Sequence, residues 1–324
     1  MAFEKYARGM EARSAQVAAL ARRCSTDPVV SELMPEDVTW DYPHRLLAAV
    51  RWLILGGEAI SYGTSEDPWE AFRSILEEHG EWVAGFIREH GIQTNEVQRS
   101  FVLLPVFLTV ARLSGRPLDL IELGASAGLN LLWDRYRYRY AEGRWGRPDA
   151  EFELTGDELS TVPGDLINRT VVVKRRLGID LDPVDISSEA GLRLLESFLL
   201  DDRPRVERLH RVAEVARRDP PELLRGDFVD LLPELLRERD EETLTVVFQT
   251  LSTIYLPDHR LRQFLEGIDQ AGSEGPLAWI STPTPSEHGQ RQGDYPVELT
   301  VWPGGERRFV ARMNVTGDRL NWLG

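Results

Sequence analysis

The segment ELGASAGLN, residues Glu122 to Asn130, has a glycine spacing that could do chemistry. Its first two residues end the short apolar run LDLIEL, and LLWDRY follows it, which predicts a buried strand, a tight turn and a helix. Such a turn brings backbone amides close to a ligand, and the amino end of a helix favours an anionic group. The dinucleotide pattern G-x-G-x-x-G is not met, because Ser126 and Leu129 occupy its second and third glycine positions.

A second interpretation of the same residues is a nucleophile elbow. The letters GASAG satisfy G-x-S-x-G, with Ser126 as the nucleophile of an α/β serine hydrolase. An elbow also needs a later acidic residue and a histidine, for which His259 and His288 are the candidates. Against it, the preceding 110 residues have helical patterning, whereas a hydrolase elbow follows several strands, and no upstream oxyanion segment is found.

The segment also resembles the first loop of class I S-adenosylmethionine-dependent methyltransferases. In that pattern an acidic residue ends the strand and glycines follow two and six positions later, as do Glu122, Gly124 and Gly128. The resemblance implies that Glu122 faces the amino group of S-adenosylmethionine and that the glycines allow close approach of the cofactor. Ser126 replaces the usual middle glycine. The loop residues assigned to cofactor binding are Glu122, Gly124, Ala125, Ser126, Gly128 and Asn130.

Further acidic residues stand where the methyltransferase pattern expects them. The resemblance implies that Asp180, at the end of the predicted second strand, takes the ribose hydroxyls, with Asp182 as the alternative. It likewise implies that Asp227, after the third strand, lies near the adenine amino group. The open alternative for Asp180 and Asp182 is that either carboxylate only caps the segment that follows it.

Two other polar groups are candidates for the site. The predicted fourth strand ends at Gln249, which we assign to the cofactor, and Tyr255 follows as a substrate contact or a core residue. The segment HGIQTNEVQRS before an apolar helix is unusually polar, and Thr94 could cap that helix. The substrate-binding candidates in that segment are Gln93, Asn95, Glu96 and Arg99.

The elements that must position these residues divide the chain in two. Residues 1–114 have apolar positions at helical spacing, with Asp67 as an expected N-cap, and predict a helical cap domain. Residues 115–324 alternate strands and helices, which predicts a mostly parallel α/β sheet. A C-terminal antiparallel hairpin is expected around Pro303-Gly304-Gly305. The expected strands are Val171–Val173 or Leu177–Leu181, Leu244–Phe248, Leu277–Ser281, Val297–Trp302 and Arg308–Val315.

Two stretches exceed a minimal α/β core. An insert at about residues 134–165 contains YRYRYAEGRWG, whose period of two predicts a hairpin. Its interleaved arginines and aromatic residues suit either a nucleic-acid contact or a solvated face. The polar, proline-rich loop at residues 280–296 is long enough to suggest a functional role.

Composition limits the classes of partner. The net charge is −15, so polyanion binding is disfavoured. Cys24 is the single cysteine, so no intrachain disulfide, Cys-based zinc site or CxxC redox pair can form. No metal-binding residues are assigned. The start lacks a signal-peptide core and no run reaches 18 apolar residues, which predicts neither secretion nor membrane spanning. We expect a cytoplasmic protein.

Four segments together resemble a bacterial family of unknown function with a methyltransferase-like domain. They are QTNEVQRSFVLLP, IELGASAGLNLLWDRYRYRY, RLGIDLDPVDI and the final hairpin. The expected fold is a Rossmann-like methyltransferase sheet with an N-terminal helical domain. The expected function is S-adenosylmethionine-dependent methylation of a small molecule. The alternatives are a serine hydrolase using Ser126 and a non-catalytic binding protein of the same fold. Oligomeric state and methyl acceptor are not predicted.

Overall fold

The computed structural model describes residues 2–35, 38–282 and 295–324, and its chain forms two compact units. The first comprises residues 1–94 and 185–210, and the second residues 95–184 and 211–324. The division differs from the predicted boundary at residue 114, because the helix at residues 100–114 belongs to the second unit. The proposed loop at residues 280–296 and His288 fall largely or wholly outside the described residues.

The first unit is helical, as its apolar spacing predicts. Asp67 caps α5 as expected, because its carboxylate accepts hydrogen bonds from the amides of Trp69 and Glu70. α4 is buried along most of its length and packs against α5 and α8. The helices of this unit are α1 (Ala2–Met10), α2 (Ala15–Cys24), α3 (Pro28–Leu33), α4 (Tyr42–Leu55), η1 (Tyr62–Thr64), α5 (Pro68–Glu89), α8 (Glu189–Leu199) and the start of α9 (Arg203–Arg218).

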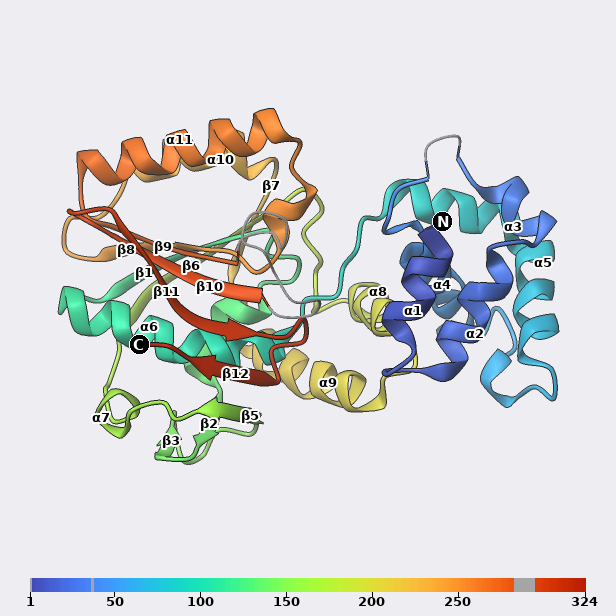
Figure 1. The fold of residues 1–324 in the computed structure, drawn as a ribbon, viewed down its shortest axis with the longest axis horizontal. Helices are drawn as coiled ribbons and strands as arrows, with labels where there is room; N and C mark the ends of the chain where they lie inside the picture. Colours follow the sequence, from blue (N-terminus) through green and yellow to red (C-terminus); the bar gives the residue numbers. More distant parts are fainter. Residues whose placement is uncertain (1, 36–37, 283–294) are drawn as a thin grey trace. The chain divides into compact units, whose positions relative to one another are not determined.

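The second unit is an α/β structure built on a nine-stranded sheet (Figure 1). The strand order is β5-β12-β11-β10-β9-β8-β1-β6-β7. Strands β7, β6, β1, β8 and β9 are parallel, and β10 and β11 form the predicted antiparallel hairpin. The strands are β1 (Leu118–Leu123), β5 (Asp157–Ser160), β6 (Val173–Asp180), β7 (Glu222–Arg225), β8 (Leu244–Phe248), β9 (Leu277–Ser281), β10 (Tyr295–Trp302), β11 (Glu306–Met313) and β12 (Arg319–Trp322).

Helices cover both faces of this sheet (Figure 1). On one face α10 (Phe228–Arg237) and α11 (Asp258–Glu274) pack on apolar residues of the central strands. On the other lies α6 (Ser100–Ser114), whose Phe107 stacks on Trp133 and contacts Phe248 edge-on. Within the described residues, the window Val97–Ser114 is long and apolar enough to cross a membrane, but 72% of it is buried, as in a core helix.

The insert forms a small second sheet of order β3-β2-β4, from β2 (Arg137–Tyr140), β3 (Gly143–Trp145) and β4 (Glu153–Thr155). β2 and β3 form the predicted hairpin. The short helix α7 (Gly164–Ile167) follows, and the remaining short helices are η2 (Val97–Arg99), η3 (Leu129–Arg135) and η4 (Ser252–Tyr255).

Candidate functional site

The order of the parallel strands locates a candidate site at their carboxyl ends. Chain order reverses at β1, which has β6 on one side and β8 on the other. In open α/β sheets ligands bind outside the carboxyl ends of the strands at such a reversal. Glu122, Asp180 and Gln249 lie at the ends of these three strands.

Glu122 is buried, with 1% of its surface exposed. Its register partners are Gly178 on β6 and Phe248 on β8, neither of which offers a polar side chain. The amide of Asn130 hydrogen-bonds to the carboxyl, while the Asn130 Oδ1 accepts from Ser100 Oγ at 2.9 Å. Among the described residues, the Oε2 atom of Glu122 has no hydrogen-bond partner. Burial raises the pKa of this carboxyl well above its ordinary value, against the lowering effect of Asn130.

The turn after Glu122 uses both glycines for left-handed backbone, with φ of +68° at Gly124 and +70° at Gly128. A Cβ at Gly124 would lie 2.4 Å from the Cβ of Ser252, and one at Gly128 would lie 2.6 Å from Cγ of Pro221. The expectation was that these glycines make room for a cofactor. In the structure the groups that require glycine are protein side chains.

Ser126 also has left-handed backbone, with φ of +54°, and is buried. Its Oγ has no hydrogen-bond partner in the described part of the chain. A nucleophile elbow exposes its hydroxyl beside a histidine, whereas this hydroxyl is enclosed and no described histidine bonds to it. The second candidate base, His288, lies outside the described residues.

The predicted helix after the turn is the short 3₁₀ helix η3. Its amide at Leu129 is already satisfied, because it donates to Asn95 Oδ1 at 3.1 Å. The Asn95 Nδ2 atom donates to the carbonyl of Ala125 at 2.9 Å. Asn95, predicted as a substrate contact, therefore clamps the two ends of the turn, and the Leu129 amide is not free for a ligand.

Asp180 holds the same turn from the β6 side. Its carboxylate accepts from the amide of Ser126 at 2.8 Å and from the amide of Asp182 at 2.9 Å. Each carboxylate oxygen can accept a second hydrogen bond, so Asp180 keeps capacity for ligand hydroxyls. Asp182 forms an ion pair with Arg225 at 2.7 Å.

No cluster of three or more potential metal-binding His, Cys, Asp or Glu side chains occurs in residues 2–35, 38–282 and 295–324.

Asp227 and Gln249 each contact one backbone amide nearby in sequence and one group 33 positions away. Asp227 caps α10 through the Val229 amide at 2.8 Å and pairs with Arg260 at 2.7 Å. Gln249 is fully buried, and its Oε1 accepts from the Ser252 amide at 3.0 Å. Its Nε2 donates to the carbonyl of Thr282 at 3.3 Å. The Asp227 carboxylate and the Gln249 amide thus serve to hold the loops around the sheet edge.

The polar segment before α6 is divided between the two units. Arg99 donates to the carbonyl of Thr250 at 3.1 Å and to that of Val315 at 3.0 Å, which ties the β8 loop to the turn between β11 and β12. Glu96 is buried and accepts from the amide of Gln98 at 3.3 Å. Gln93 is buried in the first unit.

The loop after β8 completes the site. Ser252 Oγ donates to the carbonyl of Leu123 at 2.7 Å, which holds this loop against the end of β1. Leu251 has φ of +68°, and its amide donates to Thr282 Oγ1 at 2.7 Å. Tyr255 is 49% exposed, so it is not the core residue that its pattern allowed. Sequence reasoning missed Leu251 and Thr282, since neither belongs to a recognisable motif.

Backbone strain gathers at this edge. In the described part of the second unit, the non-glycine residues with positive φ are Asn95, Ser126 and Leu251. Ser126 and Leu251 follow β1 and β8, and Asn95 is hydrogen-bonded to the β1 turn. Such strain is expensive and clusters where a site is preorganised. Its location supports the sheet edge as the functional region.

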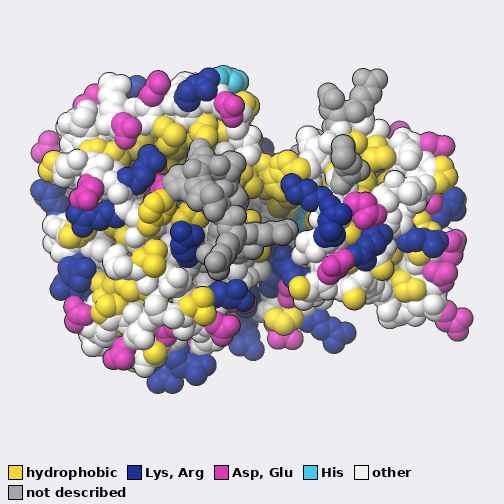
Figure 2. All heavy atoms as spheres, viewed as in Figure 1, with side chains coloured by type: hydrophobic (Ala, Val, Ile, Leu, Met, Phe, Trp, Pro, Cys, Tyr) yellow, Lys and Arg dark blue, Asp and Glu magenta, His cyan; other side chains and the backbone are white. Residues whose placement is uncertain are grey.

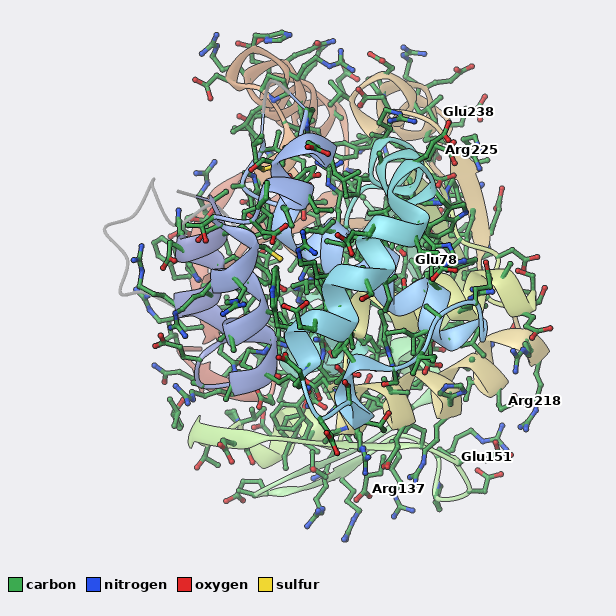
Figure 3. All side chains as sticks on the ribbon, turned by 90° about the vertical axis from the view of Figure 1, so that its right-hand side faces the viewer. Glu78, Arg137, Glu151, Arg218, Arg225 and Glu238 are labelled. Carbon is green, nitrogen blue, oxygen red and sulfur yellow. The ribbon has the colours of Figure 1, made fainter. Side chains whose placement is uncertain are left out.

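The aromatic residues of the insert pack inside the protein, where they cannot make the nucleic-acid contact considered above. Tyr138 and Tyr140 are buried, and they donate to the carbonyls of Trp133 and Phe101. Figure 2 shows basic side chains gathered over this part of the second unit. Figure 3 shows Arg137 there, with Glu151 and Arg218, which pair at 2.8 Å. Three insert arginines share the carboxylate of Glu153, and these are Arg137, Arg139 and Arg144. Base stacking on the tyrosines is therefore blocked.

Comparison with known proteins identifies the chain at the level of a family. No curated protein matches it. A family model described as "Uncharacterized protein conserved in bacteria (DUF2332)" matches residues 1–322, which is almost the whole chain. This agrees with the resemblance to a bacterial family of unknown function drawn from the motifs. The chain belongs to this uncharacterised family conserved in bacteria.

Proposed function

We propose that the protein is an S-adenosylmethionine-dependent methyltransferase that acts on a small molecule. The observation that carries the proposal is the buried Glu122 carboxyl at the reversal of strand order, one oxygen of which has no partner among the described residues. A buried polar atom without a partner is costly, and one at a ligand-binding edge is best explained by a ligand that satisfies it. Ser126 Oγ is a second such atom in the same turn.

The arrangement of strands also supports the proposal. The order β7-β6-β1-β8-β9 corresponds to the 3-2-1-4-5 order of doubly wound nucleotide-binding sheets. The acidic residues at the ends of β1 and β6 then fall at the positions that the methyltransferase resemblance implies. We therefore extend the α/β description to a Rossmann-like methyltransferase sheet as part of the proposal.

The residues fit the cofactor as follows. Glu122 would accept hydrogen bonds from its amino group, and Asp180 would take the ribose hydroxyls with its remaining acceptor capacity. When bound, S-adenosylmethionine supplies a methyl group activated for in-line transfer. Asn95, Gln249 and Ser252 hold the turn and the β8 loop in place, so the chain contributes mainly by positioning. Positioning alone is worth about 7–11 kcal/mol in favourable reactions.

Calorimetric titration with S-adenosylmethionine and S-adenosylhomocysteine tests the proposal. We expect wild-type protein to bind both, and Glu122→Ala and Asp180→Ala to weaken binding at least tenfold. Asp119→Asn is the matched control, since Asp119 lies at the opposite end of the same strand. Asp180→Ala also loses two backbone hydrogen bonds, so its folding is checked by thermal unfolding.

Two results would contradict the proposal. Absence of binding by folded wild-type protein would favour a scaffold that keeps the fold without the activity. Covalent labelling of Ser126 by a fluorophosphonate probe would favour a hydrolase.

A further inference from the structure

The burial of Glu122 disfavours the ionised form of its carboxyl in the ligand-free protein. An ionised carboxylate needs several hydrogen bonds or a close cation to offset its lost hydration. Glu122 is 1% exposed, receives the amide of Asn130, and has one oxygen without a partner among the described residues. This set is too small for a buried anion.

The charged and titratable groups that act on Glu122 come from η2, from β6 and from the segment after η3. Arg99 of η2 favours the ionised form, while Asp180 of β6 opposes it. Tyr136, which follows η3, is buried and neutral, and its hydroxyl donates to the Leu129 carbonyl. One cation and one anion act in opposite senses, so desolvation dominates and raises the pKa of Glu122 well above its ordinary value.

We propose that Glu122 is protonated in the ligand-free protein and that binding of a cationic ligand group at its carboxyl expels that proton. The inference rests on the proposed function, which supplies an ammonium group as the cation. The O–H bond of the carboxyl breaks, its electron pair stays on the carboxylate, and the proton passes to the buffer. The carboxylate then pairs with the ligand cation. No electron transfer is involved.

Linkage between binding and protonation follows from this exchange. Where free Glu122 is protonated and bound Glu122 is ionised, each binding event releases one proton. The affinity then increases with pH, by up to about tenfold per pH unit. Ligand binding and local pH are thereby coupled through a single residue.

Titration calorimetry with S-adenosylmethionine measures the released proton directly. The titration is repeated at one pH in buffers of different ionisation enthalpy, and the slope of heat against that enthalpy gives the number of protons. We expect about one proton for the wild type and none for Glu122→Gln. We also expect the pH dependence of the affinity to disappear in Glu122→Gln.

Asp119→Asn is the matched control. Asp119 lies on the same strand, is partly buried, and has a carboxyl whose pKa is raised by burial, but it lies at the other end of β1. This variant should release the same number of protons as the wild type. Loss of proton release in Asp119→Asn would assign the proton to another group and overturn the inference.

The remaining outcomes separate the inference from the proposed function. Binding by wild-type protein without proton release overturns the inference and leaves the methyltransferase proposal standing. Absence of binding at every pH overturns both.

Infrared spectroscopy of the ligand-free protein gives a second measurement. The carbonyl stretch of a protonated carboxyl should be present at neutral pH and absent from Glu122→Gln, and its absence from the wild type contradicts the inference.

Discussion

The carboxyl of Glu122 destabilises the ligand-free fold, because its neighbours do not replace the water that an ionised carboxylate loses on burial. Asn130 supplies one hydrogen bond, and the second oxygen has no partner among the described groups. A buried carboxyl that costs stability at a ligand-binding sheet edge is consistent with a role in binding.

Replacement of Glu122 by Gln should therefore stabilise the ligand-free protein. A raised pKa means that the folded state holds the proton more tightly, so the wild type loses stability as pH rises above the ordinary value of 4.5. The advantage of Glu122→Gln should grow by about 1.4 kcal/mol per pH unit above that value, until the raised pKa is reached. Chemical denaturation from pH 4.5 to 8 measures it. A pH-independent difference between the two proteins would contradict the explanation.

A second prediction concerns the stability of Gly124 variants, because both the backbone conformation of Gly124 and its surroundings exclude a side chain. Gly124→Ala should cost about 1–2 kcal/mol from the left-handed backbone alone. It should cost more because the new Cβ would lie 2.4 Å from that of Ser252. A double-mutant cycle with Ser252→Gly separates the two contributions. The second substitution should recover only the steric part, and purely additive effects would show that the contact with Ser252 is unimportant.

At the scale of elements, the turn between β1 and η3 is held from two sides, by Asn95 and by Asp180. Local sequence predicted the strand, the turn and a following helix, but not that this helix is 3₁₀ or that its first amide is capped by Asn95. It also did not predict β12, which pairs with β11 and β5. These features depend on partners far away in the chain, whereas periodicity reports only on neighbours.

The clamp by Asn95 can be tested with variants that separate the loss of its side-chain hydrogen bonds from the strain of its backbone. Asn95 has φ of +33°, which glycine tolerates and alanine does not. Asn95→Gly removes both hydrogen bonds without adding strain and should cost about 1–3 kcal/mol. Asn95→Ala should cost more. Hydrogen exchange at the Leu129 amide should accelerate in both variants. Unchanged protection at Leu129 would exclude the clamp.

At the scale of the whole molecule, the chain passes between the two units three times. The segment at residues 185–210 leaves the second unit after β6 and contributes α8 to the first.

The first unit contains a partly buried histidine, His44, which bonds to the Tyr6 hydroxyl at 2.7 Å and the Phe198 carbonyl at 2.9 Å. Burial lowers the pKa of His44 from 6.5 to about 4.

The two units should consequently respond to acid in opposite senses. A lowered histidine pKa means that stability is complete above pH 6.5 and is lost as pH falls toward 4, by at most about 3 kcal/mol. Over the same range the penalty at Glu122 decreases. Hydrogen exchange corrected for intrinsic rates should show the first unit losing protection relative to the second. His44→Gln should abolish the loss in the first unit, and a parallel decline in both units would contradict this prediction.

The sequence by itself determined the features that depend on neighbouring residues. These are the helical first part, the β1 turn with its glycines, the alternation of strands and helices, and the final hairpin. Only the tertiary structure decided which polar side chains remain available. Asp227 is paired with Arg260 and Gln249 with Thr282, each about 33 positions away, while Glu122 Oε2 keeps no partner among the described residues. Hydrogen-bonding capacity is a property of the residue type, but whether it is used depends on groups that folding brings together.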